Sequence, residues 1–259
     1  MIQNLKGVSE TLLIPLWARA VETKRSNPII IDDKAVEMME HIEYDFSKFD
    51  GRQMPQISIV IRTELLDRAT QAFMDRNPDA IIINLGCGLD TRFSRLNHGR
   101  VKWYDLDLSE PIRIRKHFFE ETDRYHMIAK SVLDYTWIED IMEDDPVLII
   151  AEGLLMYFNE NEVKKLINKL GNVFIKPEML LEVTTPIVVE KKKEYNNSFL
   201  KNAPFRWGIK DVKEITRFNP RITVLNEWNY FDYHKDRRIE AKLSLKREYS
   251  GRIVHLSLK

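Results

Sequence analysis

The sequence predicts an α/β fold with a Rossmann-like, mostly parallel sheet, an antiparallel last strand and an N-terminal helical cap. Three observations predict it. The apolar run 81–83 leads into two glycines one residue apart, Gly86 and Gly88, as in the first strand–turn–helix unit of an open parallel sheet. From residue 80 onward, strand-like and helix-like segments alternate. The final segment, 248–258, instead follows another long strand after a polar stretch, which predicts an antiparallel partner.

Composition and charge favour one soluble globular protein and exclude several classes. The chain has 259 residues, 44% of them hydrophobic and 31% charged, which suits one sizeable α/β domain with an appended cap. Its 40 basic and 40 acidic residues leave no positive excess, so we expect no nucleic-acid partner. The sequence shows no secretory signal or bilayer-spanning run, and the single cysteine, Cys87, excludes an intrachain disulfide. We expect a cytoplasmic protein without membrane contacts, and the oligomeric state stays open.

The segment 1–78 is expected to form a helical cap and a lead-in helix. Residues 9–75 read as mostly helical, and Asp32 precedes an amphipathic run as a helix start does. A further helix is expected over 58–76, because its apolar residues recur every three or four positions. An Asn-Pro-Asp turn then precedes the first strand.

The remainder, 79–259, is expected to form the sheet-bearing core. The expected strands are 80–85, 101–106, 126–130, 146–151, 179–184, 222–230 and 248–258. Helices are expected between most of them, notably at 109–121 and 159–173. Segment 187–218 interrupts this rhythm and is expected to be an insert of the cap. Its charged run predicts a solvated helix face, and its aromatic residues are expected to line or cover a cleft.

The glycine turn has the composition of a ligand-binding turn. Glycine lets the backbone turn sharply and lets a ligand approach where a Cβ would collide. A helix expected immediately after the turn would offer free N–H groups and a positive dipole end. A dinucleotide-binding turn would carry a third glycine at position 91, where this chain has Thr91. The two glycines alone leave a tight structural turn as an equal alternative.

Acidic residues stand at the ends of two later strands. Asp105 and Asp107 lie about twenty residues beyond the glycines, where an acid accepts hydrogen bonds from ribose hydroxyls in nucleotide-binding folds. The spacing leaves open which acid does so, and a charge at a helix N-terminus before Pro111 is the alternative. Glu152 ends the fourth strand, where a buried carboxylate needs a cationic partner. A cofactor with an ammonium and a sulfonium group would supply it, and a structural salt bridge is the alternative.

Three ordered motifs stand at 84–92 (Asn-Leu-Gly-Cys-Gly-Leu-Asp-Thr-Arg), 104–107 (Tyr-Asp-Leu-Asp) and 151–157 (Ala-Glu-Gly-Leu-Leu-Met-Tyr). Together they resemble the leucine carboxyl methyltransferase family. Segments 62–67 and 11–22 are similar to the N-terminal pattern of the same family, so the resemblance covers nearly the whole chain. Within the family, the chain is more similar to the bacterial branch that includes polyketide-synthesis O-methyltransferases such as the tetracenomycin enzyme. The resemblance implies a class I S-adenosylmethionine-dependent methyltransferase sheet.

The resemblance implies a role for each matching residue. Arg62 would pair with the carboxylate of the cofactor's methionine moiety, because its planar fork of donors suits that group. Glu152 would meet the amino group of the same moiety. Gly86 and Gly88 would give this moiety access to the backbone, and Asp107 would bind the ribose hydroxyls.

The segment that should contact adenine departs from the family pattern. The family usually has Asp-Leu-Arg-Asp before a tryptophan, whereas this chain has Ser-Val-Leu-Asp at 131–134 before Trp137. Ser131 can still accept a hydrogen bond, but the charge of the family's aspartate is lost at this position. Val132 would pack on the adenine ring or offer its backbone N–H.

The activity implied is methyl transfer from S-adenosylmethionine to a carboxylate or hydroxyl of a small acceptor, with aromatic and polyketide-like molecules as candidates. A carboxylate needs no base, whereas a phenol, with a pKa near 10, benefits from one. The sequence indicates no catalytic base, because the six histidines are scattered outside the motifs. Its His, Cys and Asp residues show no metal-ligand spacing either, so we expect no metal.

Aromatic residues are candidates for the lining of an acceptor pocket, each with core packing as the alternative. They are Trp17, Tyr157, Phe205 and Trp207. Two other functions stay open: methylation of a protein's C-terminal carboxylate, and cofactor binding without catalysis. A nucleic-acid methyltransferase conflicts with the zero net charge and with the segment after the fourth strand, which lacks an Asn/Asp-Pro-Pro-aromatic motif.

Overall fold

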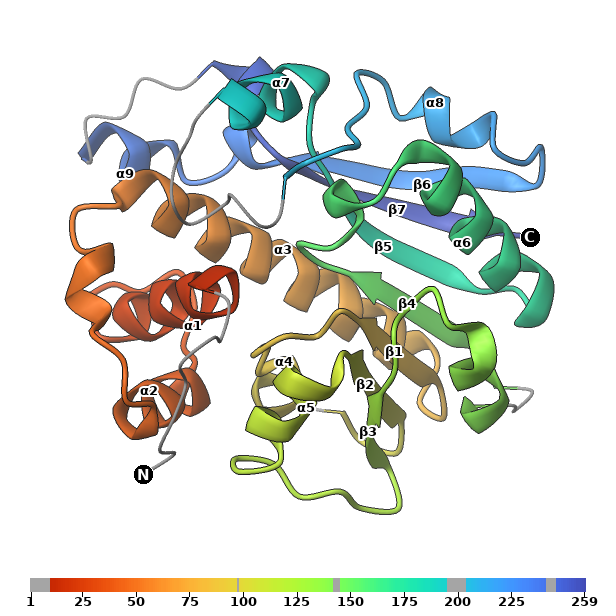
Figure 1. The fold of residues 1–259 in the computed structure, drawn as a ribbon, viewed down its shortest axis with the longest axis horizontal. Helices are drawn as coiled ribbons and strands as arrows, with labels where there is room; N and C mark the ends of the chain where they lie inside the picture. The colour runs from red at the N-terminus through yellow and green to blue at the C-terminus, as the bar shows by residue number, and fades with distance from the viewer. Residues whose placement is uncertain (1–9, 97, 142–144, 195–203, 241–245) are drawn as a thin grey trace.

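A seven-stranded mixed sheet forms the centre of the computed structural model, which describes residues 10–96, 98–141, 145–194, 204–240 and 246–259 (Figure 1). The strands are β1 (Ile81–Leu85), β2 (Lys102–Asp107), β3 (Tyr125–Ala129), β4 (Val147–Ala151), β5 (Glu178–Val183), β6 (Ile222–Asn229) and β7 (Arg252–Leu258). Their order is β3-β2-β1-β4-β5-β7-β6. Strand β7 runs antiparallel to both of its neighbours, and the other neighbouring pairs are parallel. The fold class predicted from the sequence is confirmed.

Helices connect the strands and cover the sheet. The α-helices are α1 (Glu10–Thr23), α2 (Asp33–His41), α3 (Gln53–Arg76), α4 (Arg92–Arg95), α5 (Ser109–Arg115), α6 (Glu160–Val173), α7 (Pro186–Glu194), α8 (Lys213–Thr216) and α9 (Lys235–Glu240). The 3-10 helices are η1 (Phe46–Phe49), η2 (Tyr135–Ile141), η3 (Leu155–Tyr157), η4 (Tyr230–Asp232) and η5 (Arg247–Tyr249). Figure 1 shows α1 and α2 beside the sheet, with the long α3 running from them towards β1.

Two apolar clusters pack against the two faces of the sheet. One joins α1, α2 and α3 to Ile82 of β1, and the other joins α6 to Ile81, Ile83 and Leu85. Successive residues of β1 alternate between the clusters because successive side chains of a strand point to opposite faces. All five residues of β1 are buried, which explains why four of them are apolar, with Asn84 as the exception.

The strand register brings the carboxyl ends of β1, β2 and β4 together at one edge of the sheet. Strand β1 pairs in parallel with β2 and β4, with Leu85 opposite both Leu106 and Ala151. Strands β2 and β3 lie on one side of β1, and β4 and β5 on the other. In open α/β sheets, the crevice at such a reversal of strand order binds ligands at the carboxyl ends of the strands.

The elements follow the sequence-based expectations with four main differences, one of which is that α3 begins at Gln53, five residues before the expected start at residue 58. Strand β7 begins at Arg252 rather than at residue 248, because η5 occupies the segment before it. Helix α5 ends at Arg115, six residues before the expected end. The helix expected immediately after the glycines is the main correction: α4 is a single turn that starts at Arg92, because Leu96 after it is already extended. The glycine turn therefore has no long helix behind it.

Helix α2 starts where the sequence predicts. The side chain of Asp32 accepts the backbone N–H of Ala35 at 2.9 Å and caps α2. Division of the chain into a cap at 1–78 and a core at 79–259 stays a prediction. Part of the expected insert at 187–218 lies outside the described residues. The described helices include none that is long and apolar enough to cross a bilayer.

Candidate cofactor site

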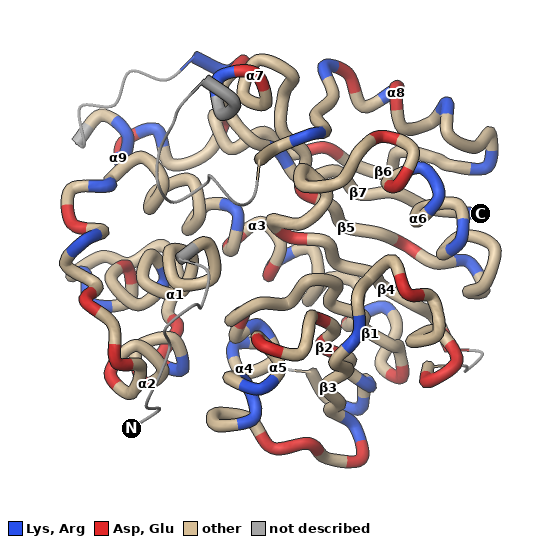
Figure 2. Tube along the Cα trace, in the orientation of Figure 1, with Lys and Arg blue, Asp and Glu red and all other residues tan. Residues whose placement is uncertain are grey.

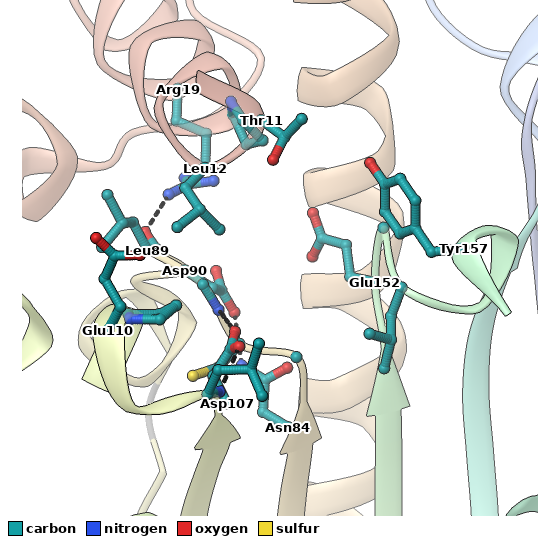
Figure 3. A pocket seen from close by; sticks show the side chains of 18 of the residues that line it. Thr11, Leu12, Arg19, Asn84, Leu89, Asp90, Asp107, Glu110, Glu152 and Tyr157 are labelled. Atoms are coloured by element: carbon teal, nitrogen blue, oxygen red, sulfur yellow. Dashed lines mark hydrogen bonds between the residues drawn. The ribbon is translucent and has the colours of Figure 1, made fainter. Parts of the chain in front are cut away.

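A cavity of about 600 Å³ lies at the carboxyl edge of β1, β2 and β4. The predicted site residues that line it are Arg62, Gly86, Gly88, Asp107, Glu152 and Tyr157. In Figure 3, Glu152 and Tyr157 form one wall, Thr11 and Leu12 reach in from α1, and Asp107 lies at the end of β2. A volume of this size falls within the ~300–1,000 Å³ typical of sites for cofactors and small molecules.

Two glycines give the cavity a wall of bare backbone. Gly86 has φ +63° and Gly88 has φ +48°, a conformation that disfavours side chains. A Cβ on Gly86 would lie 2.7 Å from Cδ1 of Leu154, and one on Gly88 would lie 2.9 Å from Cδ2 of Leu12. The turn therefore favours glycine for its backbone conformation, and a Cβ at either position would also require the end of a leucine side chain to move.

Asp107 faces the cavity next to the glycine turn. Its Oδ2 accepts the backbone N–H of Gly88 at 2.7 Å, and its Oδ1 accepts that of Leu108 at 2.7 Å. Burial raises the pKa of Asp107, and these two hydrogen bonds offset only part of the effect. Further donors from a ligand, such as a pair of hydroxyls, would stabilise the charged carboxylate.

Asp105, the other acid of β2, belongs to the core. It is 1% exposed, and it pairs with Arg115 and accepts the hydroxyl of Tyr125 at 2.6 Å. Nδ2 of Asn84 donates to its other oxygen at 3.1 Å. These donors satisfy the Asp105 carboxylate without a ligand. The geometry therefore favours Asp107 as the acid that faces a ligand, a choice that the spacing left open.

Four charged residues of alternating sign form a row beside the cavity. This charged row consists of Arg92, Glu152, Arg62 and Glu182. Glu152 pairs through Oε2 with Arg92 and through Oε1 with Arg62, both at 2.7 Å. Arg62 in turn donates through Nη1 to Oε2 of Glu182 at 2.9 Å. The salt bridge named as the alternative for Glu152 is thus present, while the residue also lines the cavity.

In the charged row, ion pairing shifts the pKa values of Arg62 and Glu152 more strongly than burial does. Burial would lower the pKa of Arg62, but Glu152 and Glu182 raise it well above its usual value. Burial would likewise raise the pKa of Glu152, but Arg62 and Arg92 lower it below the usual value. Arg62 and Glu152 are therefore both charged at neutral pH.

A second group of ion pairs supports the end of the glycine turn. Arg92 donates to Asp67 and to Asp90 at 2.7 Å each. Arg95 pairs with Asp67 and with Asp32 at 2.8 Å each. Figure 2 shows the resulting mixture of basic and acidic residues around α4. These pairs join the start of α2 to α3 and α4, next to the cavity that Asp90 lines.

The charged residues of the cavity lining are mostly acidic. They are the cations Arg19 and Arg62 and the carboxylates Asp90, Asp107, Glu110 and Glu152. Two positive against four negative groups leave a charge of −2 when all are ionised. A ligand with one more positive than negative group complements this lining. S-adenosylmethionine, with a sulfonium, an ammonium and a carboxylate, is such a ligand.

Comparison with known proteins shows the family of the chain. The leucine carboxyl methyltransferase family model matches residues 13–171. The chain belongs to this family. Tetracenomycin polyketide synthesis O-methyltransferase TcmP of Streptomyces glaucescens is 29% identical over 230 residues, which cover 88% of this chain and 85% of the relative. The S-adenosyl-L-methionine-dependent methyltransferase dpfgK of Gibberella zeae is 33% identical over 254 residues, which cover 87% and 85%.

Solved structures share the fold of this family member. A candidate methyltransferase from Thermobifida fusca aligns with a TM-score of 0.61 and 12% identity over 94% of each chain. Magnesium protoporphyrin IX methyltransferase (ChlM) of Synechocystis, with bound SAH, aligns with a TM-score of 0.52 and 12% identity over 87% of this chain and 93% of ChlM. The family and these relatives identify an S-adenosylmethionine-dependent methyltransferase, and the solved structures show the same fold.

Five predicted site residues are not part of the cavity lining. Ser131 is exposed in the loop after β3, and Val132 is buried, with its carbonyl accepting Nε1 of Trp137 at 3.2 Å. Trp17 and Trp207 are each 4% exposed within the two apolar clusters, which is the core packing that was the alternative. Phe205 contacts the ring of Tyr157, which does line the cavity. The binding roles of all five residues stay predictions.

Sequence reasoning missed two members of the charged row, Arg92 and Glu182. Glu182 lies near the end of β5 as Glu152 follows β4, so the argument from a carboxylate at a buried strand end applies to it equally. Burial raises the pKa of Cys87, so this buried thiol stays protonated at neutral pH. Groups of three or more His, Cys, Asp or Glu placed to bind a metal are absent from the described part of the chain. A metal-free reaction stays a prediction.

Proposed function

We propose that the protein transfers the methyl group of S-adenosylmethionine to an oxygen, in a carboxylate or a hydroxyl, of a small aromatic or polyketide-like acceptor. The observation that most supports this is the acidic cavity, which has Arg62 and Glu152 at one wall and Asp107 at another. The relative TcmP, an O-methyltransferase of polyketide synthesis by name, supports oxygen as the methyl acceptor.

The cavity offers a group for each polar part of the cofactor. Asp107 would accept the ribose hydroxyls. Arg62 would bind the methionine carboxylate, and Glu152 would bind the ammonium group. The backbone of Gly86 and Gly88 would leave room for the chain that links these parts.

The loop after β3 is our candidate for the adenine contact. Strand β3 neighbours β2 in the sheet, so this loop lies next to the strand end that carries Asp107. Ser131 would accept a hydrogen bond from the ring, and Val132 would contribute an apolar surface or its backbone N–H.

The residues of the cavity would align the acceptor and exclude water. S-adenosylmethionine, when bound, supplies a methyl group on a positively charged sulfur. Alignment of this kind contributes up to ~7–11 kcal/mol in well-oriented model reactions. Burial and the charge of Glu182 raise the pKa of Tyr157 to about 12, so its phenol is protonated at neutral pH. Tyr157 would therefore orient the acceptor oxygen as a hydrogen-bond donor rather than remove its proton.

Apolar side chains of the lining support a small acceptor. Leu12 and Pro15 come from α1, and Leu154 and Tyr157 follow β4. Phe205 packs edge-on against Tyr157, with ring centroids 5.3 Å apart. Flat, apolar molecules suit a lining of this kind.

Calorimetric titration tests the cofactor, and a panel of acceptors incubated with the labelled cofactor tests the reaction. We expect S-adenosylmethionine and S-adenosylhomocysteine both to bind, and the label to appear in the ester or aryl ether of a small acceptor. Label in a peptide C-terminal ester alone would favour a protein acceptor instead. Binding without transfer across the panel would favour a non-catalytic homologue, and binding of neither ligand would overturn the proposal.

A further inference from the structure

Glu182 is fixed by donors from three different parts of the chain. It is 8% exposed and is not among the residues that line the cavity. Its Oε2 accepts Nη1 of Arg62 at 2.9 Å and the backbone N–H of Gly153 at 2.8 Å. Its Oε1 accepts the hydroxyl of Tyr230 at 3.1 Å. One carboxylate therefore links α3, the turn after β4, and η4.

Arg62 depends on its two terminal nitrogens for its orientation. Nη2 pairs with Glu152 at 2.7 Å, and Nη1 donates to Glu182 at 2.9 Å. Nε is buried and finds no hydrogen-bond partner within the described residues. A guanidinium group binds a carboxylate in a directed, planar geometry, so its orientation decides how well it binds one.

The charged row allows the central pair to change partners. When the ligand's carboxylate meets Arg62 and its ammonium meets Glu152, each residue keeps a second partner within the protein. Glu182 is that partner for Arg62, and Arg92 is that partner for Glu152, at 2.7 Å. If Arg62 and Glu152 lacked these second partners, replacing their mutual ion pair with contacts to the ligand would leave each buried charge with one contact fewer. The loss of a contact to a buried charge is costly in free energy.

We propose that Glu182 is a positioning residue, which holds Arg62 in the orientation that binds the methionine carboxylate of the cofactor. Tyr230 and the N–H of Gly153 hold Glu182 in turn. This inference rests on the role proposed above for Arg62.

Strand β5 provides a matched control at its other end. Glu178 pairs with Arg76 of α3 at 3.3 Å and with His255 at 2.7 Å. An Arg–Glu pair thus joins helix α3 to each end of β5. Glu178→Gln repeats the chemical change of Glu182→Gln on the same two elements, at a residue that does not line the cavity.

The test compares two ligands that differ in the amino-acid part. S-adenosylhomocysteine contains it, and 5′-methylthioadenosine lacks it. By calorimetry, we expect Glu182→Gln to weaken S-adenosylhomocysteine about ten- to hundred-fold, as the loss of a charge-assisted contact does, and to change 5′-methylthioadenosine less than about two-fold. Tyr230→Phe should also weaken the binding of S-adenosylhomocysteine more than that of 5′-methylthioadenosine, but by a smaller factor. Glu178→Gln should change neither affinity, and Glu182→Asp, which keeps the charge, should recover part of the loss.

Two results would overturn the inference: unchanged affinity of Glu182→Gln for S-adenosylhomocysteine, or an equal loss for both ligands, as a general defect of the fold produces. If Glu182→Gln does not fold, Tyr230→Phe decides by the same criteria. Arg62→Met provides the reference. If Arg62→Met changes the ratio of the two affinities and Glu182→Gln does not, this inference alone fails. If Arg62→Met leaves the ratio unchanged, the proposed role of Arg62 fails and the inference fails with it.

Discussion

The backbone N–H of Gly88 donates a hydrogen bond of 2.7 Å to Oδ2 of Asp107, which ties the turn after β1 to the end of β2. The same carboxylate lines the cavity, so it can accept further donors from a ligand. Asp105, two residues earlier, is enclosed by Arg115 and Tyr125. Two acids on one strand thus serve different purposes because only one of them reaches the cavity.

Asp107→Asn should weaken the binding of S-adenosylhomocysteine about ten- to hundred-fold, because an amide offers one acceptor oxygen where the carboxylate offers two. Calorimetric titration measures this change. Asp105→Asn is the matched contrast: it breaks a buried pair and should lower the free energy of unfolding by about 3–5 kcal/mol in urea. An Asp107→Asn protein with the affinity of the wild type would show that another group binds the ribose.

The affinity for S-adenosylhomocysteine should fall as the solution is made acidic. Burial raises the pKa of Asp107, so the free protein takes up a proton there at a higher pH than an ordinary aspartate does. A protonated carboxyl is a poorer acceptor for two hydroxyls, so binding should weaken as the pH falls through the raised pKa and stay constant above it. Titrations of the wild type from neutral to acidic pH measure this slope. The slope should be smaller in Asp107→Asn, and an equal slope in both proteins would contradict the assignment.

Asp32 should contribute stability that is lost in acid. Burial would raise its pKa, but Arg95 and Arg19 lower it below the ordinary value of 3.8. The unfolded chain therefore takes up the proton first as the pH falls, so this stability is present above the ordinary value and disappears as the pH falls through the lowered pKa. Asp32→Asn should cost about 3–5 kcal/mol of unfolding free energy at neutral pH. Urea unfolding over a pH series should show the difference from the wild type shrinking in acid. A difference independent of pH would argue against this account.

Gly88→Ala should reduce both stability and cofactor affinity. The backbone has φ +48°, and the new Cβ would lie 2.9 Å from Cδ2 of Leu12. The strained conformation costs about 1–3 kcal/mol, measured by urea unfolding. Gly99→Ala is the control, since φ is +51° there and the new Cβ meets nothing within 4 Å. It should show a comparable loss of stability with unchanged affinity, and a loss of affinity in both variants would mean that backbone strain alone disturbs the site.

Tyr157→Phe should slow methyl transfer without weakening the cofactor. Removal of one neutral hydrogen bond costs about 0.5–1.5 kcal/mol, so kcat/KM for the acceptor should fall about two- to ten-fold. The affinity for S-adenosylhomocysteine should stay within about two-fold of that of the wild type. Because the pKa of Tyr157 is raised to about 12, the rate should also show no inflection from this phenol near its ordinary value of 10. If the wild-type rate showed an inflection near pH 10 and the rate of Tyr157→Phe did not, Tyr157 would instead act as a base.

Local patterns in the sequence were sufficient to predict the sheet. Strands β1 and β4 are buried on both faces; β4 reads as an uninterrupted apolar run, and β1 as one broken only by Asn84. Parallel register then brings their carboxyl ends to one edge, which is why acids at strand ends, such as Asp107 and Glu152, could be assigned to one site. For Arg62, the family resemblance supplied the assignment.

The partners of these residues could not be predicted in the same way. Arg62 and Glu182 are 120 residues apart in sequence, and their contact depends on how α3 crosses the sheet. The exposure of Trp17 and Trp207 likewise depends on packing that no local pattern reports. The sequence did not indicate that α4 is only one turn long. The helix ends there because the backbone is already extended at Leu96.

Asp32 caps α2, pairs with Arg19 of α1 and Arg95 of α4, and accepts the hydroxyl of Thr91 at 2.5 Å. Its contacts thus cross the chain position where a boundary was expected, at residue 78. A chimaera that joined the first helices of one relative to the sheet of another at that position would separate this carboxylate from half of its donors. Transfer of these helices between relatives would therefore require Thr91 and Arg95 to be transplanted with them.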